Sequence, residues 1–289
     1  MSEKKLYNIL DRAVISVTGP EASSFLQAII TNDIYKVSQT NSIYSCILTP
    51  QGKYAFDFFI SYFEDKFFIE IDKLCAKQLI SKLNLYKLRK NIEIKMEDEY
   101  EVLSLQELID QEQAWLTLPF LSGLKYIDPR YSKMGYRAII KSDSLPEILA
   151  AYNQTLNSYE YYRINNGIPE GNKDLRFEKS FPLEYGLDYL NAIDFKKGCY
   201  VGQEVTARTK YRGLIRKKIY VVKAINDISI DKEVYLNEIK VGNVTSVFGN
   251  IGLALIREEE YHNEKAKDQN IAPTIEGKEV SLITPIWQV

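Results

Sequence analysis

The sequence predicts a protein of mixed helices and strands that ends in a small antiparallel barrel. Three observations support this prediction. The chain has 289 residues and 45% hydrophobic content, enough for a large core and for two or three domains. Up to about residue 212, segments with helical and with strand-like spacing of apolar residues alternate. From Arg216 to the end, short strand-like segments recur between turns that contain glycine.

In the first part of the chain, each apolar segment can be assigned by its spacing. The expected strands are 13–17, 44–49, 53–63, 66–71, 92–96, 100–105 and 138–141. One helix is expected after Gly19-Pro20, with Phe25, Leu26, Ile29 and Ile30 on one face. Three more are expected at 72–88, 144–156 and 158–166. Asp72 is expected to cap the second helix, and Gly167 with Pro169 to end the last one. Cys75, on the apolar face of its helix, is expected to be structural.

The C-terminal segments are all short and favour strands. They are 219–223, 233–236, 240–247, 253–256 and 280–283, with turns expected at Gly242, at Gly249-Asn250 and at Gly277. The sequence contains no internal repeat, and no low-complexity linker separates these segments from the rest of the chain. We therefore place the domain boundary near Gly213, with one region at 1–212 and the barrel at 213–289.

Composition excludes several classes of chemistry. Lys plus Arg number 37 and Asp plus Glu number 39, so the net charge of −2 gives no general attraction to nucleic acid or to an anionic membrane. The single histidine, His262, lies in a polar stretch that is expected to be an exposed loop. Ser-His-Asp hydrolysis, histidine zinc sites and histidine general bases are thereby excluded. No metal site is predicted.

The chain also carries signals about its location. The segment MSEKKLYNILDR lacks the apolar run of a signal peptide, and no stretch approaches the ~20 apolar residues of a membrane span. The three cysteines, Cys46, Cys75 and Cys199, are far apart in sequence and do not suggest a disulfide framework. We expect a cytoplasmic protein, without a membrane partner and monomeric.

The most unusual stretch is Lys196 to Gly213, KKGCYVGQEVTARTKYRG. Gly198 next to Cys199 suggests a thiol presented on a tight bend, and a helix that starts near Val201 would place its positive end close by. Such a helix end, together with Lys197, would favour the thiolate. Burial as a small hydrophobic residue is the alternative for Cys199.

The octapeptide Lys197-Gly198-Cys199-Tyr200-Val201-Gly202-Gln203-Glu204 resembles the K-G-C-Y-x-G-Q-E signature of the YgfZ family. These proteins are folate-binding relatives of the glycine-cleavage T-protein that assist iron-sulfur enzymes. Other segments are similar to the family too. They are G-P-E-A-S-S-F-L-Q at 19–27, T-N-D at 31–33, L-T-P-Q-G-K at 48–53 followed by Asp57, D-P-R at 128–130, G-Y-R at 135–137, and the stretches 163–169 and 181–184.

The resemblance implies an α+β, GcvT-like fold, with two interleaved α/β sub-domains and the C-terminal β-barrel around a central channel. It implies tetrahydrofolate or a derivative as cofactor, and iron-sulfur proteins or assembly factors as partners, with tRNA involved only indirectly. It implies a role in maturation or repair of iron-sulfur enzymes, including enzymes of tRNA modification. Cys199 would be the reactive thiol, assisted by Lys197.

The remaining site residues are also carried over from the family. Asp57 and Glu184 would hold the folate, Gln203 and Glu204 would orient the cysteine loop, and Tyr200 and Arg208 would complete the binding site. Without the family, Asp57 reads as a solvent-facing acid on a half-buried strand, and Glu184 as a surface acid.

Departures from the T-protein leave other functions open. This chain has Asn165 where the aminomethyltransferases carry a glutamate, and Phe56-Asp57 where they carry paired acids. A tetrahydrofolate-dependent one-carbon transferase, with Asp57 steering the folate nitrogen, is one alternative. A binding module for tRNA or a partner protein is the other. No second nucleophile is visible, so no reaction can be written.

Basic residues gather around the cysteine motif. Eight lysines and arginines lie between 196 and 218, against the single acid Glu204. They form either a solvated face or an anion site, for the glutamate tail of a folate or for a phosphate backbone. Arg208, Lys210 and Arg212 are expected to lack acidic partners and to serve an anionic partner.

Overall fold

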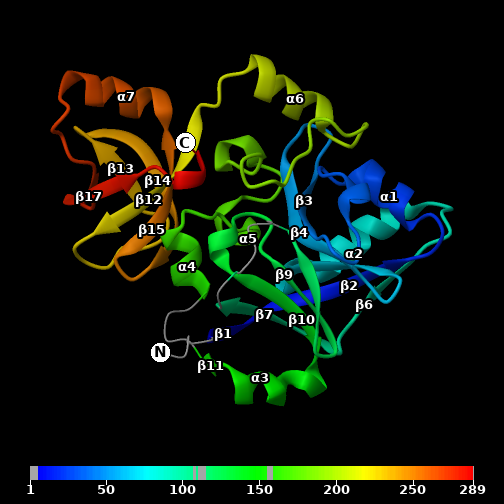
Figure 1. Cartoon of the computed structure of the whole chain (residues 1–289). Helices are drawn as coiled ribbons and strands as arrows, with labels where there is room; N and C mark the ends of the chain where they lie inside the picture. The colour runs from blue at the N-terminus through cyan, green and yellow to red at the C-terminus, as the bar shows by residue number, and fades with distance from the viewer. Residues whose placement is uncertain (1–5, 107–108, 110–114, 155–158, 289) are drawn as a thin grey trace.

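The structure is a computed structural model that describes residues 6–106, 109, 115–154 and 159–288. Two sheets lie beside a closed barrel (Figure 1). The five-stranded sheet has the order β3 (Ile43–Leu48), β4 (Tyr54–Phe63), β5 (Lys66–Asp72), β2 (Arg12–Thr18), β6 (Glu93–Met96). The six-stranded sheet has the order β11 (Asn153–Gln154), β1 (Leu6–Leu10), β7 (Tyr100–Gln106), β10 (Tyr136–Lys141), β9 (Gly123–Ile127), β8 (Thr117–Phe120).

The barrel forms the C-terminal part of the chain. Its strands follow the order β12 (Lys217–Ala224), β15 (Ile251–Arg257), β14 (Ile239–Phe248), β13 (Glu233–Leu236), β16 (Thr274–Ile275), β17 (Lys278–Ile283). All neighbouring pairs are antiparallel, and inward-facing side chains such as Val222, Val234 and Ile256 fill the interior. The predicted antiparallel barrel is confirmed.

The sheets and helices form layers. Helices α1 (Ala22–Ile29) and α2 (Lys73–Lys87) cover one face of the five-stranded sheet, and α3 (Leu145–Ala151) covers the far face of the other sheet. The remaining helices are α4 (Tyr159–Asn165), α5 (Gly171–Asp174), α6 (Gln203–Arg212) and α7 (Glu258–Lys267). Alternation along β5 shows the layering: Ile69 faces the helices, while Phe68 and Glu70 face the other sheet.

A buried ion network joins the two sheets. Glu70 of β5 lies 2.6 Å from Arg12 Nε of β2 and binds Arg137 of β10 across the layer. The network continues through the pairs Arg130–Asp128, Arg137–Asp128, Arg12–Glu170 and Arg163–Asp174. These side chains are almost completely buried, and each guanidinium faces at least one carboxylate, which offsets the cost of removing the charges from water. The D-P-R and G-Y-R motifs are therefore structural.

Several element predictions are corrected by the structure. The polar stretch around His262 is helix α7 rather than a loop, because its acids occupy the first turn, its lysines the last, and Glu264 is buried. Gly242 lies inside β14 rather than in a turn, where a Cβ would stand 2.4 Å from the Leu255 carbonyl oxygen. The helix expected at 144–156 ends at Ala151, before β11, and residues 155–158 lie outside the described part.

The other helix and strand predictions hold within a few residues. Asp72 caps α2 by accepting a bond from the backbone N–H of Leu74, and Phe25, Leu26, Ile29 and Ile30 are core residues beneath α1. Strands β1, β8, β9 and β16 and the short helix α5 were not predicted. Within the described residues, no helix has the length and apolar content needed to cross a bilayer.

Candidate functional site

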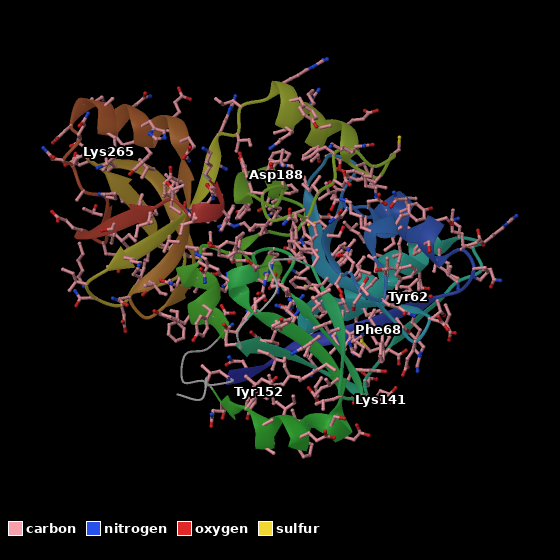
Figure 2. The ribbon with its side chains drawn as sticks, in the orientation of Figure 1. Tyr62, Phe68, Lys141, Tyr152, Asp188 and Lys265 are labelled. Carbon is pink, nitrogen blue, oxygen red and sulfur yellow. The ribbon has the colours of Figure 1, made fainter. Side chains whose placement is uncertain are left out.

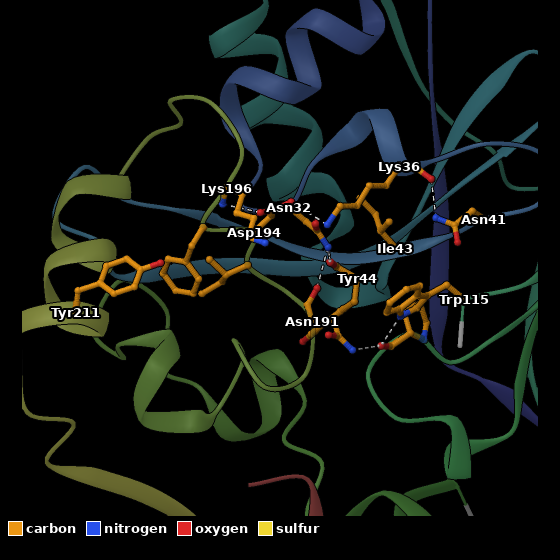
Figure 3. A pocket seen from close by; sticks show the side chains of 13 residues that line it. Asn32, Lys36, Asn41, Ile43, Tyr44, Trp115, Asn191, Asp194, Lys196 and Tyr211 are labelled. Carbon is orange, nitrogen blue, oxygen red and sulfur yellow. Dashed lines mark hydrogen bonds and ion pairs between the residues drawn. The ribbon is translucent and has the colours of Figure 1, made fainter. Parts of the chain in front are cut away.

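A cavity of about 820 Å³ opens between β3, the Trp115 to Pro129 region and the irregular segment that precedes α6 (Figure 3). Aromatic rings make much of its wall, with Trp115 and Tyr211 at opposite ends and Tyr44 between them. The lining residues are Asn32, Lys36, Asn41, Ile43, Tyr44, Trp115, Pro129, Asn191, Ile193, Asp194, Phe195, Lys196 and Tyr211. A cavity of this size, with aromatic walls interspersed with amide and charged side chains, suits a drug-sized planar ligand that carries polar groups.

Residues 191–200, which we call the strap, form one wall of the cavity. Three bonds hold it against the end of α1: Thr31 Oγ1 donates to the Ala192 carbonyl at 2.7 Å, Asn32 Nδ2 to the Asn191 carbonyl at 2.8 Å, and the Asp194 N–H to the Thr31 carbonyl at 3.0 Å. Because side chain and backbone at Thr31 and Asn32 bind the strap together, the T-N-D motif fixes the cavity wall.

Asp194 places a carboxylate on that wall. Its oxygens lie 2.8 Å from Lys36 Nζ and 2.7 Å from the Lys196 backbone N–H. Burial alone would raise the pKa of Asp194, but Lys36 and the backbone N–H groups of Lys196 and Lys197 together outweigh it, and the pKa lies below its ordinary value. The carboxylate is therefore ionised at neutral pH and keeps unused lone pairs toward the cavity.

Lys197 anchors the end of the strap. Its ammonium donates three hydrogen bonds, to the carbonyl oxygens of Gln27 at 2.8 Å, Ile30 at 2.6 Å and Asn32 at 2.9 Å. These carbonyls belong to the C-terminal end of α1 and the turn after it, where unpaired carbonyls and the helix dipole attract a cation. Burial lowers the pKa of Lys197 to about 8. The hydrogen bonds of this ammonium thus go to the backbone at the end of α1 and in the turn after it.

Cys199 is presented outside this anchor. Gly198 and Cys199 are exposed, while Lys197 before them and Tyr200 after them are buried. Gly202 then turns the chain into α6 with φ of 84°, and a Cβ there would lie 2.5 Å from the Thr49 carbonyl oxygen. The expected bend and helix are present, and the burial alternative for this thiol is wrong because the residue is exposed.

The other two cysteines lie in different surroundings. Cys46 is completely buried on β3, and burial together with Asp57 raises its pKa well above the ordinary value. Cys75 is half-buried on α2, and burial raises its pKa to about 11. Among the described residues, no cluster of His, Cys, Asp or Glu side chains has the arrangement of a metal site.

Asp57 lies behind the cavity wall. Its two carboxylate oxygens accept bonds of 2.7 Å from the hydroxyls of Tyr44 and Tyr54, and its exposed fraction is 7%. The solvent-facing interpretation is therefore wrong, because β4 turns this side chain into the layer between the sheets. Asp57 does not line the cavity. Of Asp57 and its two tyrosine partners, only Tyr44 is a lining residue.

The remaining predicted residues are spread around the site. Glu184 lies in the short turn Pro182–Tyr185, 3.7 Å from Lys217 Nζ, and does not line the cavity. Tyr200 is buried, with its ring 5.2 Å from Lys197 Nζ, and Gln203, Glu204 and Arg208 lie along α6. The structure thus brings Lys197, Cys199 and Tyr200 together in one loop, with Asp57 and Glu184 elsewhere.

Some of the eight basic residues between 196 and 218 form ion pairs with acids. Lys210 Nζ lies 2.7 Å from Asp188, and Lys217 and Lys218 pair with Glu184 and Glu258. The prediction that Lys210 has no acidic partner is therefore wrong, because Asp188, labelled in Figure 2, lies below α6 and was not recognised as its neighbour.

Sequence reasoning missed Asp194, Trp115 and Phe195 as cavity residues. They come from loops, whose neighbours are set by the tertiary fold and not by a periodic pattern. A signal was present for another lining residue, Asn32, which belongs to the T-N-D segment.

Comparison with solved structures defines the class of fold. The chain superposes on the glycine cleavage system aminomethyltransferase T of Bartonella henselae with a TM-score of 0.78, over 99% of this chain and 86% of that one. At 15% sequence identity the likeness concerns the fold alone. The GcvT-like α+β class with a C-terminal barrel is thereby confirmed, and residues 216–289 match the family model of the CAF17 C-terminal beta-barrel domain.

Sequence relatives give the family. The chain is 36% identical to the mitochondrial iron-sulfur cluster assembly factor IBA57 homologue of Neurospora crassa over 230 residues, which are 74% of this chain and 52% of that protein. It is 30% identical to the homologue of Pyricularia oryzae, over 95% of this chain and 77% of that protein. It is 27% identical to human IBA57, over 96% and 83%. The chain belongs to the IBA57 family of iron-sulfur cluster assembly factors.

Two facts qualify this membership. The chain spans about half the length of the Neurospora crassa relative and 56% of the one from Mycosarcoma maydis. The relatives carry mitochondrial in their names, so the predicted cytoplasmic location is wrong by this comparison. That prediction relied on the N-terminal residues, on the lack of a long apolar stretch and on the scattered cysteines, which do not distinguish the cytoplasm from the mitochondrial interior.

Proposed function

We propose that this protein assists the assembly or repair of iron-sulfur clusters in client enzymes, with Cys199 as its reactive thiol. Membership of the IBA57 family supports a role in iron-sulfur cluster assembly. The exposed thiol, in a loop between the buried residues Lys197 and Tyr200, supports the role of Cys199. Its partners are the iron-sulfur client enzymes and other proteins of cluster assembly. The clients include enzymes of tRNA modification, so the protein affects tRNA only indirectly. The eight-residue YgfZ signature supports this finer assignment.

The exposed cysteine is the observation that carries the proposal. A thiolate is a strong ligand for iron, and an exposed thiol on a short, anchored loop can reach a cluster held on another protein. One cysteine supplies only one of the ligands that a cluster needs, so the partner provides the others. The protein then acts on a cluster in transit.

Reduced folate is the proposed ligand of the cavity, and the lining fits it in three respects. The volume of about 820 Å³ is sufficient for a drug-sized ligand, and the ring of Trp115 at one end of the cavity can stack on a planar pterin, with Phe195 and Tyr211 at the other end against the rest of the ligand. The carboxylate of Asp194 can accept from the amino edge of the pterin, in place of Asp57 or Glu184. Lys196, exposed at the rim, suits the glutamate tail.

One-carbon transfer receives less support. Asp57, the residue that would steer the folate nitrogen, has both carboxylate oxygens bound by tyrosine hydroxyls. We assign it instead the role of holding Tyr44 in the cavity wall. The proposed domain boundary between 1–212 and 213–289 falls in the loop between α6 and β12, which separates the cavity region from the barrel.

Folate binding can be measured by calorimetry with 5-formyltetrahydrofolate. We expect binding to the parent protein and about a tenfold loss of affinity in Trp115→Ala, because a stacking wall is removed. Tyr35→Ala is the matched control, since Tyr35 is 68% exposed and does not line the cavity. Absence of heat and of any thermal shift at millimolar ligand would rule out folate as the ligand.

A further inference from the structure

Helix α6 leaves most of its surface without a partner. It lies at the edge of the molecule between the barrel and the sheets (Figure 1), and among its residues only Thr206 is buried. The inner side of α6 packs against the turn after β3. A Cβ added to Gly52 in this turn would lie 3.1 Å from the Cβ of Val205. Arg208, Tyr211 and Arg212 lie on one outer face by helical spacing.

This outer face is apolar and positive. We define the α6 stripe as Arg208, Tyr211, Arg212, Leu214 and Arg216. Tyr211 is 69% exposed and Leu214 is 74% exposed. The nearby acids Asp188, Glu184 and Glu258 are paired with lysines. Among the described residues, no ion pair joins an acid to any of the three arginines. Glu204, one turn before Arg208, is the acid on the same helix, so the stripe keeps a net positive charge.

We propose that the α6 stripe is the docking surface for a protein partner with an acidic surface. The inference rests on the proposed function and adds the partner's chemistry. Arginine and tyrosine are enriched at the centres of protein interfaces, and complementary charge speeds association. Nucleic acid fits less well, because the chain has a net charge of −2 and Glu204 lies on the same helix, nearest to Cys199.

The distances favour one partner that covers both features. A helix of ten residues is about 15 Å long, and Cys199 lies four residues before its first residue. A standard interface covers about 800 Å² of each protein, a patch roughly 30 Å across. A partner seated on the stripe would therefore bring its own cluster ligands within reach of the thiol.

The test measures binding of a purified acidic [2Fe–2S] ferredoxin to the full chain. We expect Kd to weaken as salt rises from 50 to 200 mM, and to weaken about tenfold in the double variant Arg208→Glu with Arg212→Glu. The control carries the same charge change at two exposed lysines elsewhere, Lys77→Glu with Lys278→Glu, and should bind within about twofold of the parent. Leu214→Ser, which leaves the cavity residue Tyr211 in place, should weaken binding even at high salt.

Three outcomes would overturn the proposal: no binding by the parent protein, equal loss in the α6 and control variants, or binding of the α6 stripe to transfer RNA in place of the acidic protein. The variant Cys199→Ser separates this proposal from the proposed function. It should dock normally and fail only in cluster support, so loss of docking by the stripe variants and loss of support by the thiol variant are independent results.

Discussion

Replacement of Glu70 by alanine should lower the free energy of unfolding by about 3 to 5 kcal/mol. Glu70 is fully buried between the two sheets, where its carboxylate contacts Arg12, Arg137 and the hydroxyl of Tyr126. Its removal leaves two guanidinium groups close together without their shared counter-charge. Denaturant unfolding followed by circular dichroism measures the loss, which is a large part of the total stability of a typical domain.

The control for this variant is Glu233→Ala. Glu233 pairs with Lys240 on the barrel surface, where the carboxylate is 44% exposed, so its loss should have a far smaller effect on the free energy of unfolding than the loss of Glu70. Burial alone would raise the pKa of Glu70, but Arg137 and Arg12 outweigh it and hold the pKa below 4.5. The stability that Glu70 contributes is therefore present above pH 4.5 and falls away in more acidic solution. A loss of less than 1 kcal/mol in Glu70→Ala would show that the network is dispensable.

Replacement of Lys197 by methionine should cost about 2 to 3 kcal/mol, because three carbonyl oxygens at the end of α1 lose a charged donor. Lys196→Met is a close control, since the neighbouring lysine is exposed and its ammonium has no ion pair within the described chain. It should change the unfolding free energy by less than about 0.5 kcal/mol. Thermal and denaturant unfolding of both variants gives the comparison.

The pH dependence gives Lys197 a second, independent test. Its pKa is about 8 in the folded protein and 10.5 ordinarily, so between these values the unfolded chain binds more protons. The stability of the parent relative to Lys197→Met should therefore rise from pH 8 toward pH 10. Equal stabilities of the two methionine variants would contradict the anchoring role, whereas a gap that narrows with pH would contradict the lowered pKa of Lys197.

Periodic patterns predicted most of the fold. The alternation along β4 and β5 and the helical spacing in α1 and α2 depend on neighbours in sequence, and these elements are present. The strands β8 and β9 were missed because Pro119 and Gly123 interrupt their pattern. Helix α7 was missed because it is polar almost throughout and is held by its contacts with the barrel strands, such as the ring contact between Tyr220 and Tyr261.

The sequence predicted the exposed cysteine loop of the site but not the cavity beside it. The glycines around Cys199 announce a bend by their own conformational freedom, so the exposed thiol could be expected from eight residues. Lys197 could not be placed by the same reasoning, since its partners Gln27, Ile30 and Asn32 are more than 160 residues away in sequence. The cavity wall depends in the same way on Asn32 meeting Asn191.

We expect Cys199 to be a reactive thiol that the fold does not need. With limiting iodoacetamide, native protein should be labelled at Cys199 well before Cys75 or the buried Cys46, because Cys199 alone is exposed and burial raises the pKa of the other two. Such labelling would show that the Cys199 thiol is accessible in the native protein.

The decisive measurement is the activity of an iron-sulfur enzyme, such as aconitase, in cells that depend on this protein and carry Cys199→Ser or Cys75→Ser. We expect Cys199→Ser to unfold at the temperature of the parent and to leave the enzyme without its cluster, while Cys75→Ser supports it normally. Full enzyme activity with Cys199→Ser would contradict the central claim that this thiol serves cluster assembly.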